Sequence, residues 1–123
     1  MNYLLDANSV ILVLSGHPAV VARLANCDAR EVAVSAIAFA EVAFGSARGK
    51  PPPPAVLDAF LDQIILLPFD EKAARAYTSL PFRRGSFDRL IAAHALSLNL
   101  TLVTANEGDF ADVPGLKIEN WAV

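Results

Sequence analysis

Short apolar runs that favour β-strands alternate along the chain with longer segments of helical periodicity, and this alternation limits the possible folds more than any other feature. The runs cover residues 2–6, 31–35, 64–69, 101–104 and 116–120. Strands that alternate with helices are typical of a parallel sheet with helices on both of its faces. We therefore predict an α/β fold, a three-layer α/β/α sandwich around a mostly parallel sheet of about five strands.

Capping residues and helix breakers mark the helices between these runs. Apolar residues at helical spacing follow Ser35, and the pattern stops at Gly49 and four consecutive prolines. The other predicted helices cover residues 55–63, opened by Pro54, residues 70–80, capped by Asp70, and residues 87–99, beginning at Ser86. A short turn or helix is expected over residues 106–113.

Composition restricts the domain organisation and the location of the protein. A chain of 123 residues with 54% hydrophobic content has material for one packed core, so we expect a single domain over residues 1–123. No uncharged apolar run reaches the roughly 18 residues that a membrane span needs. No basic segment precedes the first apolar one, so a secretory signal is not supported and we expect a soluble, cytoplasmic protein. The single cysteine, Cys27, excludes an internal disulfide.

Charge and hydrophobicity bear on possible partners. The net charge of −3 argues against nucleic acid, because phosphate binding usually leaves a basic footprint. That objection weakens if a divalent metal binds several of the acids, because the ion inverts the local field. The high hydrophobic content also favours a large apolar interface with a partner or a second copy.

Acidic and polar side chains stand where strands of the predicted sheet end. Asp6 closes the first strand, and Thr104, Asn106 and Asp109 close or follow the fourth. Binding sites of such sheets form outside the carboxyl ends of the strands. Two further acids lie on helices that follow strands or turns: Glu41, six residues after Ser35, and Asp88, in the first turn of the helix from Ser86. The four acids Asp6, Glu41, Asp88 and Asp109 are therefore expected to converge.

Each acid also has a purely structural explanation. Asp6 is suited to cap a helix beginning near Asn8, and Asp88 to interact with a helix dipole for about 0.3–1 kcal/mol. Asp109 fits a solvated turn. Glu41 is harder to explain in this way, because it interrupts an apolar helix face and has no basic residue three or four positions away.

A cluster of four carboxylates needs a cation. Two carboxylates about 4 Å apart repel by roughly 4 kcal/mol at an effective dielectric constant near 20. With two histidines and one cysteine in the chain, one or two hard divalent ions, Mg²⁺ or Mn²⁺, are the expected ligands. Such ions activate water and stabilise an in-line phosphoryl displacement, which is the chemistry of a phosphodiesterase.

Four stretches of the sequence resemble the PIN-domain ribonucleases, in particular the VapC toxins of bacterial toxin–antitoxin pairs. The stretches are YLLDAN, SAIAFAEVAFG, FDRLIAAHALSLNLTLVTANEGDF and PGLKIENW, and together they span nearly the whole chain. The resemblance implies a homodimer that cleaves structured RNA, of the tRNA or rRNA class, with Mg²⁺ or Mn²⁺. It also implies inhibition by a cognate VapB-like antitoxin.

The resemblance further implies roles for individual residues. Asp6, Glu41 and Asp88 would bind metal, and Asn8, Ser35 and Thr104 would orient ligands, water or backbone. The position where the family often has a fourth acid is Asn106 here, and Asp109 would supply that charge, with Asn106 in support.

Two other features depart from the family pattern. A small hydroxyl residue commonly follows the first acid, and Ala7 replaces it here. The ten residues between Tyr77 and Asp88 form a shorter segment than in many relatives, which would alter the substrate groove.

Basic residues are the candidates for RNA binding. Arg83, Arg84 and Arg89 surround Asp88 and are candidates to hold phosphates beside the metal. Arg48 and Lys50, next to the prolines, are a second candidate pair. Ordinary surface charge is the alternative for all five. We expect His94 to have a packing or surface role rather than a catalytic one, and Phe110 and Trp121 to pack in the core.

Two other functions remain open at this point. A phospho-acceptor signalling domain shares the parallel sheet, strand-end acids and Mg²⁺, but it requires paired acids after the first strand and a lysine near the last strands. Asp6 stands alone, and no lysine lies between Lys72 and Lys117. The second alternative is a degenerate PIN domain that binds a partner or RNA without cleaving it, which Asn106 leaves open.

Overall fold

Five parallel strands form the centre of the molecule. The computed structural model describes residues 1–123. The strands are β1 (Tyr3–Leu5), β2 (Val32–Ser35), β3 (Ile65–Leu67), β4 (Thr101–Val103) and β5 (Ile118–Glu119). They pair in the order β3-β2-β1-β4-β5, and every pairing is parallel. The predicted five-stranded parallel sheet is therefore confirmed.

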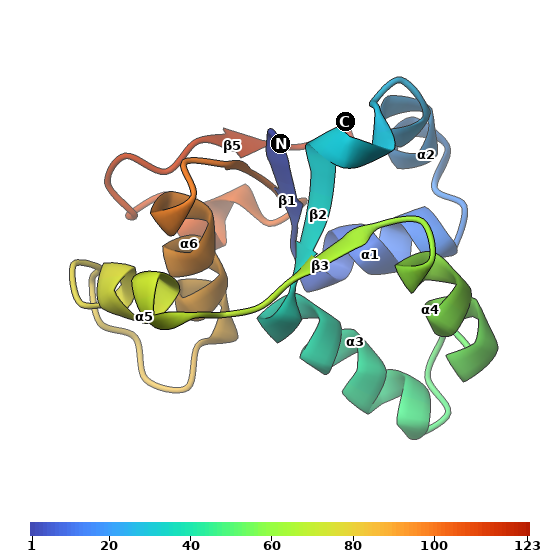
Figure 1. Cartoon of the computed structure of the whole chain (residues 1–123), viewed down its shortest axis with the longest axis horizontal. Helices are drawn as coiled ribbons and strands as arrows, with labels where there is room; N and C mark the ends of the chain where they lie inside the picture. The colour runs from blue at the N-terminus through green and yellow to red at the C-terminus, as the bar shows by residue number, and fades with distance from the viewer.

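Helices cover both faces of this sheet. They are α1 (Ala7–Leu14), α2 (Pro18–Ala25), α3 (Ala36–Ala47), α4 (Pro54–Leu61), α5 (Glu71–Tyr77) and α6 (Phe87–Ser97), with short 3₁₀ segments η1 (Ala29–Glu31) and η2 (Glu107–Phe110). In Figure 1, α5 and α6 lie to the left of β1 and β2, and α1, α2 and α4 lie to their right. Helix α3 packs against both α1 and α6. The three-layer α/β/α prediction is confirmed.

Local signals account for where most helices begin. Ser35, Asp70 and Ser86 each cap the helix predicted for them through a side-chain oxygen that accepts a backbone N–H. Our predictions do not include α2, which begins with Pro18 at a position where its missing N–H needs no partner. No single helix is long and apolar enough to span a membrane; α1 and α2 pass that test only as a pair, and they meet at 95°.

The core lies on both faces of the central strands. Leu4, Leu5, Val34 and Leu102 are completely buried, as expected for strands with helices on either side. Phe110 and Trp121 belong to the same core, as predicted. Because both faces are covered, the strands show continuous apolar runs instead of an alternating pattern.

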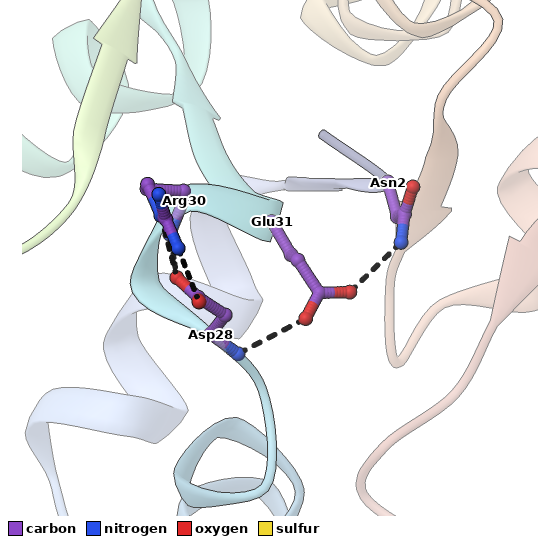
Figure 2. Close-up of polar contacts among 4 residues, drawn as sticks. All are labelled: Asn2, Asp28, Arg30 and Glu31. Atoms are coloured by element: carbon purple, nitrogen blue, oxygen red, sulfur yellow. Dashed lines mark hydrogen bonds and ion pairs between the residues drawn. The ribbon is translucent and has the colours of Figure 1, made fainter.

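Polar contacts tie the amino ends of β1 and β2 together (Figure 2). The Asn2 amide donates to Glu31 at 2.8 Å, and the other Glu31 carboxylate oxygen accepts the Asp28 backbone N–H at 3.1 Å. Arg30 in turn donates to the Asp28 carboxylate. This arrangement is a capping box at the start of η1. Asn2 and Glu31 directly precede the paired residues Tyr3 and Val32, and the same register places Leu5, at the end of β1, beside Val34.

The direction of the connections changes beside β1. The chain runs from β1 to β2 to β3, and then returns to place β4 on the other side of β1. In doubly wound sheets, ligands bind at the carboxyl edge beside such a change of direction. Leu5 pairs with Val103 there, so the next residues along the two strands, Asp6 and Thr104, stand at this edge.

Candidate active site

Asp6 lies at the carboxyl end of β1 and also caps α1. Its backbone N–H donates to Val103 at 3.2 Å, and its Oδ1 accepts the Ser9 N–H at 2.8 Å. Both interactions keep the carboxylate at the junction of β1 and β4, where only 4% of the residue is exposed. The proposed capping role is thus present, and it coexists with a position at the edge where ligands bind.

Glu41 and Asp88 reach this edge from two helices that pack against each other. Glu41 lies in the middle of α3, and Asp88 lies in the first turn of α6. Burial raises the pKa of Glu41, and the nearby Asp88 and Asp6 carboxylates raise it further. Mutual effects on pKa require proximity, so the structure brings three of the predicted acids from separate segments into one cluster.

Asp109, on the 3₁₀ segment η2, joins this cluster from the β4 side. Burial raises the pKa of Asp88, and repulsion from Asp109 is the next largest cause. Burial likewise raises the pKa of Asp6, Asp109 adds to the effect, and hydrogen bonds from Thr104 and Ser9 oppose it. The nearby Arg89 and Arg83 lower the pKa of Asp88, but they do not offset its burial and its repulsion by the other acids.

The donor atoms of the cluster suit a hard cation. Glu41 Oε1 is buried and accepts no hydrogen bond from the protein. A carboxylate oxygen in that state needs a donor or a metal ion. The carboxylates do not form a ready-made site, however, because no three aspartate, glutamate, histidine or cysteine side chains are close enough to share one ion directly. Mg²⁺ commonly keeps several waters and uses one or two protein carboxylates, which such spacing allows.

The residues predicted to support the acids have different surroundings. Thr104 is 1% exposed, and its hydroxyl accepts the Asn106 N–H at 3.0 Å, which ties the turn after β4 to the site. Ser35 is completely buried and accepts the Ile37 N–H at 3.1 Å. Asn8 and Asn106 are exposed. Thr104 forms a side-chain hydrogen bond with Asp6, and Ser35 caps the start of α3.

A hydrogen bond between Ser35 and His94 connects α3 and α6 and was not foreseen from the sequence. The two side chains are 2.8 Å apart, and His94 also packs edge-on against Phe69. His94 is 1% exposed, and burial lowers its pKa. Of the packing and surface roles expected for His94, the structure shows packing. The contact with Ser35 helps to hold the helices that carry Glu41 and Asp88.

The three arginines near Asp88 behave differently. Arg84 is exposed and forms no ion pair, so its guanidinium is available to phosphate. Arg83 lies 3.6 Å from Asp112. The prediction that Arg89 binds RNA is wrong in this structure, because its side chain is 1% exposed and pairs with Asp112 at 2.6 Å. Asp112 was not singled out in the sequence, where nothing marks it as the partner of an arginine 23 residues earlier.

A doubly wound parallel sheet with acids converging at its carboxyl edge defines the class of α/β proteins to which PIN domains belong. The family model of the PIN domain matches residues 3–116, and the chain belongs to the PIN domain family.

Individual relatives identify the VapC type within this family. The tRNA(fMet)-specific endonuclease VapC of Shigella flexneri is 31% identical over 131 residues, which cover 99% of each chain. Ribonuclease VapC2 of Rickettsia felis is 32% identical over 132 residues, with 98% of each chain covered. These findings confirm the resemblance that the sequence motifs indicate.

Solved structures of similar proteins agree with this assignment. The VapBC2 complex of Rickettsia felis, bound to a DNA fragment from its promoter, contains a chain that superimposes with a TM-score of 0.86 at 32% identity. The superposition covers 98% of this chain and 99% of that one. DNA-bound VapBC of Salmonella typhimurium gives a TM-score of 0.85 at 28% identity, with 98% of both chains covered. The phospho-acceptor alternative receives no support from these relatives.

Proposed function

We propose that the protein is a metal-dependent endoribonuclease toxin of the VapC type. The observation that carries this proposal is the convergence of Asp6, Glu41, Asp88 and Asp109 at the carboxyl edge of β1 and β4, with three raised pKa values. Relatives named as ribonucleases support the same activity. Asp6 is buried and Glu41 and Asp88 are half-buried. Such a cluster of acids is costly to a fold unless a ligand neutralises it, so its presence favours a functional site.

Asp6, Glu41, Asp88 and Asp109 are the residues that would hold Mg²⁺ or Mn²⁺, one ion or two. When bound, such an ion activates a water and offsets negative charge on the phosphate that is attacked. Asp6 is held rigidly by β1 and by its cap on α1, and Glu41 presents an oxygen without a protein partner. No side chain of the cluster needs to act as a nucleophile. Thr104 and Ser9 keep Asp6 oriented toward the edge.

The substrate that we propose is a structured RNA of the tRNA or rRNA class. The name of the Shigella flexneri relative supports a tRNA substrate. Arg84, exposed and unpaired, is suited to contact a phosphate beside Asp88. Arg83 is a weaker candidate because it already faces Asp112.

We propose two protein partners. The VapBC complexes of Rickettsia felis and Salmonella typhimurium support a VapB-like antitoxin, and the second partner is another copy of the chain. An apolar pocket of about 540 Å³ next to Glu41, lined by Ile37, Ala40, Phe44 and Phe87, supports a protein interface at this place. Phe44 and Phe87 are 61% and 56% exposed, which is unusual for large apolar side chains unless another molecule covers them. Light scattering of the purified chain would test the dimer by measuring its molar mass. A monomer mass at all concentrations would contradict the dimer.

The nuclease is tested with total cellular RNA and purified protein freed of any antitoxin. We expect discrete fragments with Mg²⁺ or Mn²⁺, none with EDTA, and none from Glu41→Gln. The matched control is Asp58→Asn, which neutralises an exposed acid on α4 and should cleave normally. End mapping of the fragments would identify the RNA.

A second readout separates binding from turnover. The metal should raise the melting temperature of the wild type increasingly as its concentration rises above the dissociation constant, and Glu41→Gln should reduce that shift. Metal binding without cleavage of any RNA would refute the nuclease and favour a degenerate PIN domain, which Asn106 at the position of a fourth acid makes a concrete alternative.

A further inference from the structure

A second pocket, distinct from the apolar one, adjoins the acid cluster on the side of α1. It has a volume of about 250 Å³ and lies between α1 and α3. Glu41 and Phe44 line it, together with Asn8, Gly45, Lys50 and Pro51. Glu41 and Phe44 line both pockets, so a polymer bound at the acids can extend into either pocket.

The two hollows differ in charge. Four of the five residues around the apolar pocket are hydrophobic, and its only charged residue is Glu41 itself. The pocket beside α1 contains a cation, Lys50, and an amide, Asn8. A polyanion that approaches Glu41 is repelled by the acids, and Lys50 lies where that repulsion can be offset. The charge pattern therefore favours the α1 side for an anionic ligand.

Lys50 is free to bind such a ligand. Ion pairs engage Arg23, Arg30, Arg75, Arg83 and Arg89, and none involves Lys50. The backbone of Lys50 is nevertheless fixed, because its N–H donates to the Gly45 carbonyl at 3.0 Å. Its stem lies along α3 at Gly45, where a Cβ would be 3.7 Å from two Lys50 carbons. The anchored stem leaves the ammonium group as the mobile, unpaired part.

Phe44 and Asn8 give the pocket groups that recognise a nucleobase. The Phe44 ring is 61% exposed, and the Arg48 guanidinium lies 3.5 Å from its centre and donates to the Phe44 carbonyl at 3.2 Å. Arg48 covers one face of the ring, and the opposite face of this exposed side chain is a stacking surface for a base. The Asn8 amide forms no hydrogen bond within the protein and so has both donors and an acceptor available.

We propose that this pocket binds the nucleotide next to the cleaved phosphodiester in a single-stranded segment of RNA. Lys50 contacts the phosphate of that nucleotide, Phe44 stacks on its base, and Asn8 contacts the base edge. The assignment rests on the proposed ribonuclease function, because it places the scissile phosphate at Glu41 and its neighbours. Single-stranded RNA suits the pocket, since an unpaired base can leave its stack and lie against an aromatic ring.

The test measures binding of a fluorescently labelled single-stranded oligoribonucleotide of mixed sequence by anisotropy, in EDTA, at several salt concentrations. Lys50→Gln should weaken binding and lower the slope of log K against log salt by about 0.7, the value for one phosphate contact on a single strand. Lys117→Gln is the control, because Lys117 is also exposed and unpaired but lies outside this pocket, at the amino end of β5. The control should leave both quantities unchanged.

Phe44→Leu tests the stacking contact separately. Binding should weaken by roughly fivefold to a hundredfold with no change in the salt slope, since stacking releases no counterions. The control is Phe82→Leu, which changes another exposed phenylalanine outside this pocket. Equal effects of Phe82→Leu and Phe44→Leu, or equal salt slopes for Lys50→Gln and the wild type, would overturn the assignment. An effect of Lys50→Gln on an acidic peptide but not on RNA would also overturn it.

The same proteins, assayed for cleavage of total RNA with Mn²⁺, distinguish failure of this inference from failure of the nuclease. Cleavage by the wild type with no effect of Lys50→Gln or Phe44→Leu on RNA binding refutes the pocket and keeps the nuclease. Binding that depends on Lys50 and Phe44 without cleavage under any metal supports the pocket and refutes the nuclease.

Discussion

Replacing Asp6 by Asn and by Ala separates its structural role from its proposed catalytic role. Asp6 Oδ1 accepts the Ser9 N–H at 2.8 Å, and the side-chain oxygen of Asn can accept the same bond. Ala cannot, and loss of a helix N-cap typically costs about 1 kcal/mol. We therefore expect the metal-free Asp6→Asn protein to be at least as stable as the wild type, and Asp6→Ala to be about 1 kcal/mol less stable than Asp6→Asn.

The dependence of stability on pH gives the sign of the charge effect. Burial and repulsion raise the pKa of Asp6 above its ordinary value of 3.8, so the folded state binds the proton more strongly than the unfolded state. The stability gained from the protonated Asp6 is complete below the ordinary pKa and is lost as pH rises through the pKa of Asp6 in the folded state. Urea denaturation in EDTA, from neutral to mildly acidic pH, should therefore show Asp6→Asn gaining its greatest advantage over the wild type at neutral pH.

Cleavage should respond differently from stability. A metal ion contributes several kcal/mol of charge stabilisation in the transition state, and each 1.36 kcal/mol is a factor of ten in rate. Both variants should therefore cleave RNA at least about a hundredfold more slowly, although one of them is fully stable. The reasoning would be refuted if Asp6→Asn cleaved RNA at the wild-type rate, or if Asp6→Asn lost as much stability as Asp6→Ala.

Three further changes test the packing that positions the site. Burial lowers the pKa of His94 below 6.5, so the stability that the neutral side chain contributes is lost as pH falls from 6.5 through the pKa of the folded state. The difference in unfolding free energy between the wild type and His94→Phe should therefore narrow as pH falls. A difference that stays constant with pH would contradict this. Asp112→Asn should lower the urea concentration at the unfolding midpoint, because it leaves the buried Arg89 guanidinium without its ion pair. Adding Arg89→Met to the same chain should restore the midpoint. A midpoint that does not recover would show that the ion pair is not the cause. Leu102→Ala should lower the free energy of unfolding, measured by urea denaturation, by about 2–5 kcal/mol, because Leu102 is completely buried. Leu98→Ala, at a 40% exposed position, should lower it little. Similar losses for the two variants would refute the burial argument.

Sequence patterns that depend on neighbouring residues predicted the scaffold well. Ser35, Asp70 and Ser86 cap the expected helices because a cap is made between a side chain and the backbone two or three residues later. Asp6 and Thr104 could be placed at strand ends because a strand buried on both faces appears as a continuous apolar run. The convergence of the acids followed from the parallel arrangement of those strands, although their metal-binding role remains a prediction.

Contacts between distant segments decided what the sequence left open. Arg84 and Arg89 are both arginines on the same short stretch, yet Arg84 is exposed and Arg89 is buried against Asp112. Lys50 lines a pocket because α1 packs beside α3. Local patterns report the conformation of the backbone, because capping and periodicity act over a few residues. The environment of a charged side chain depends on segments far away in the chain, and only the tertiary structure brings those segments together.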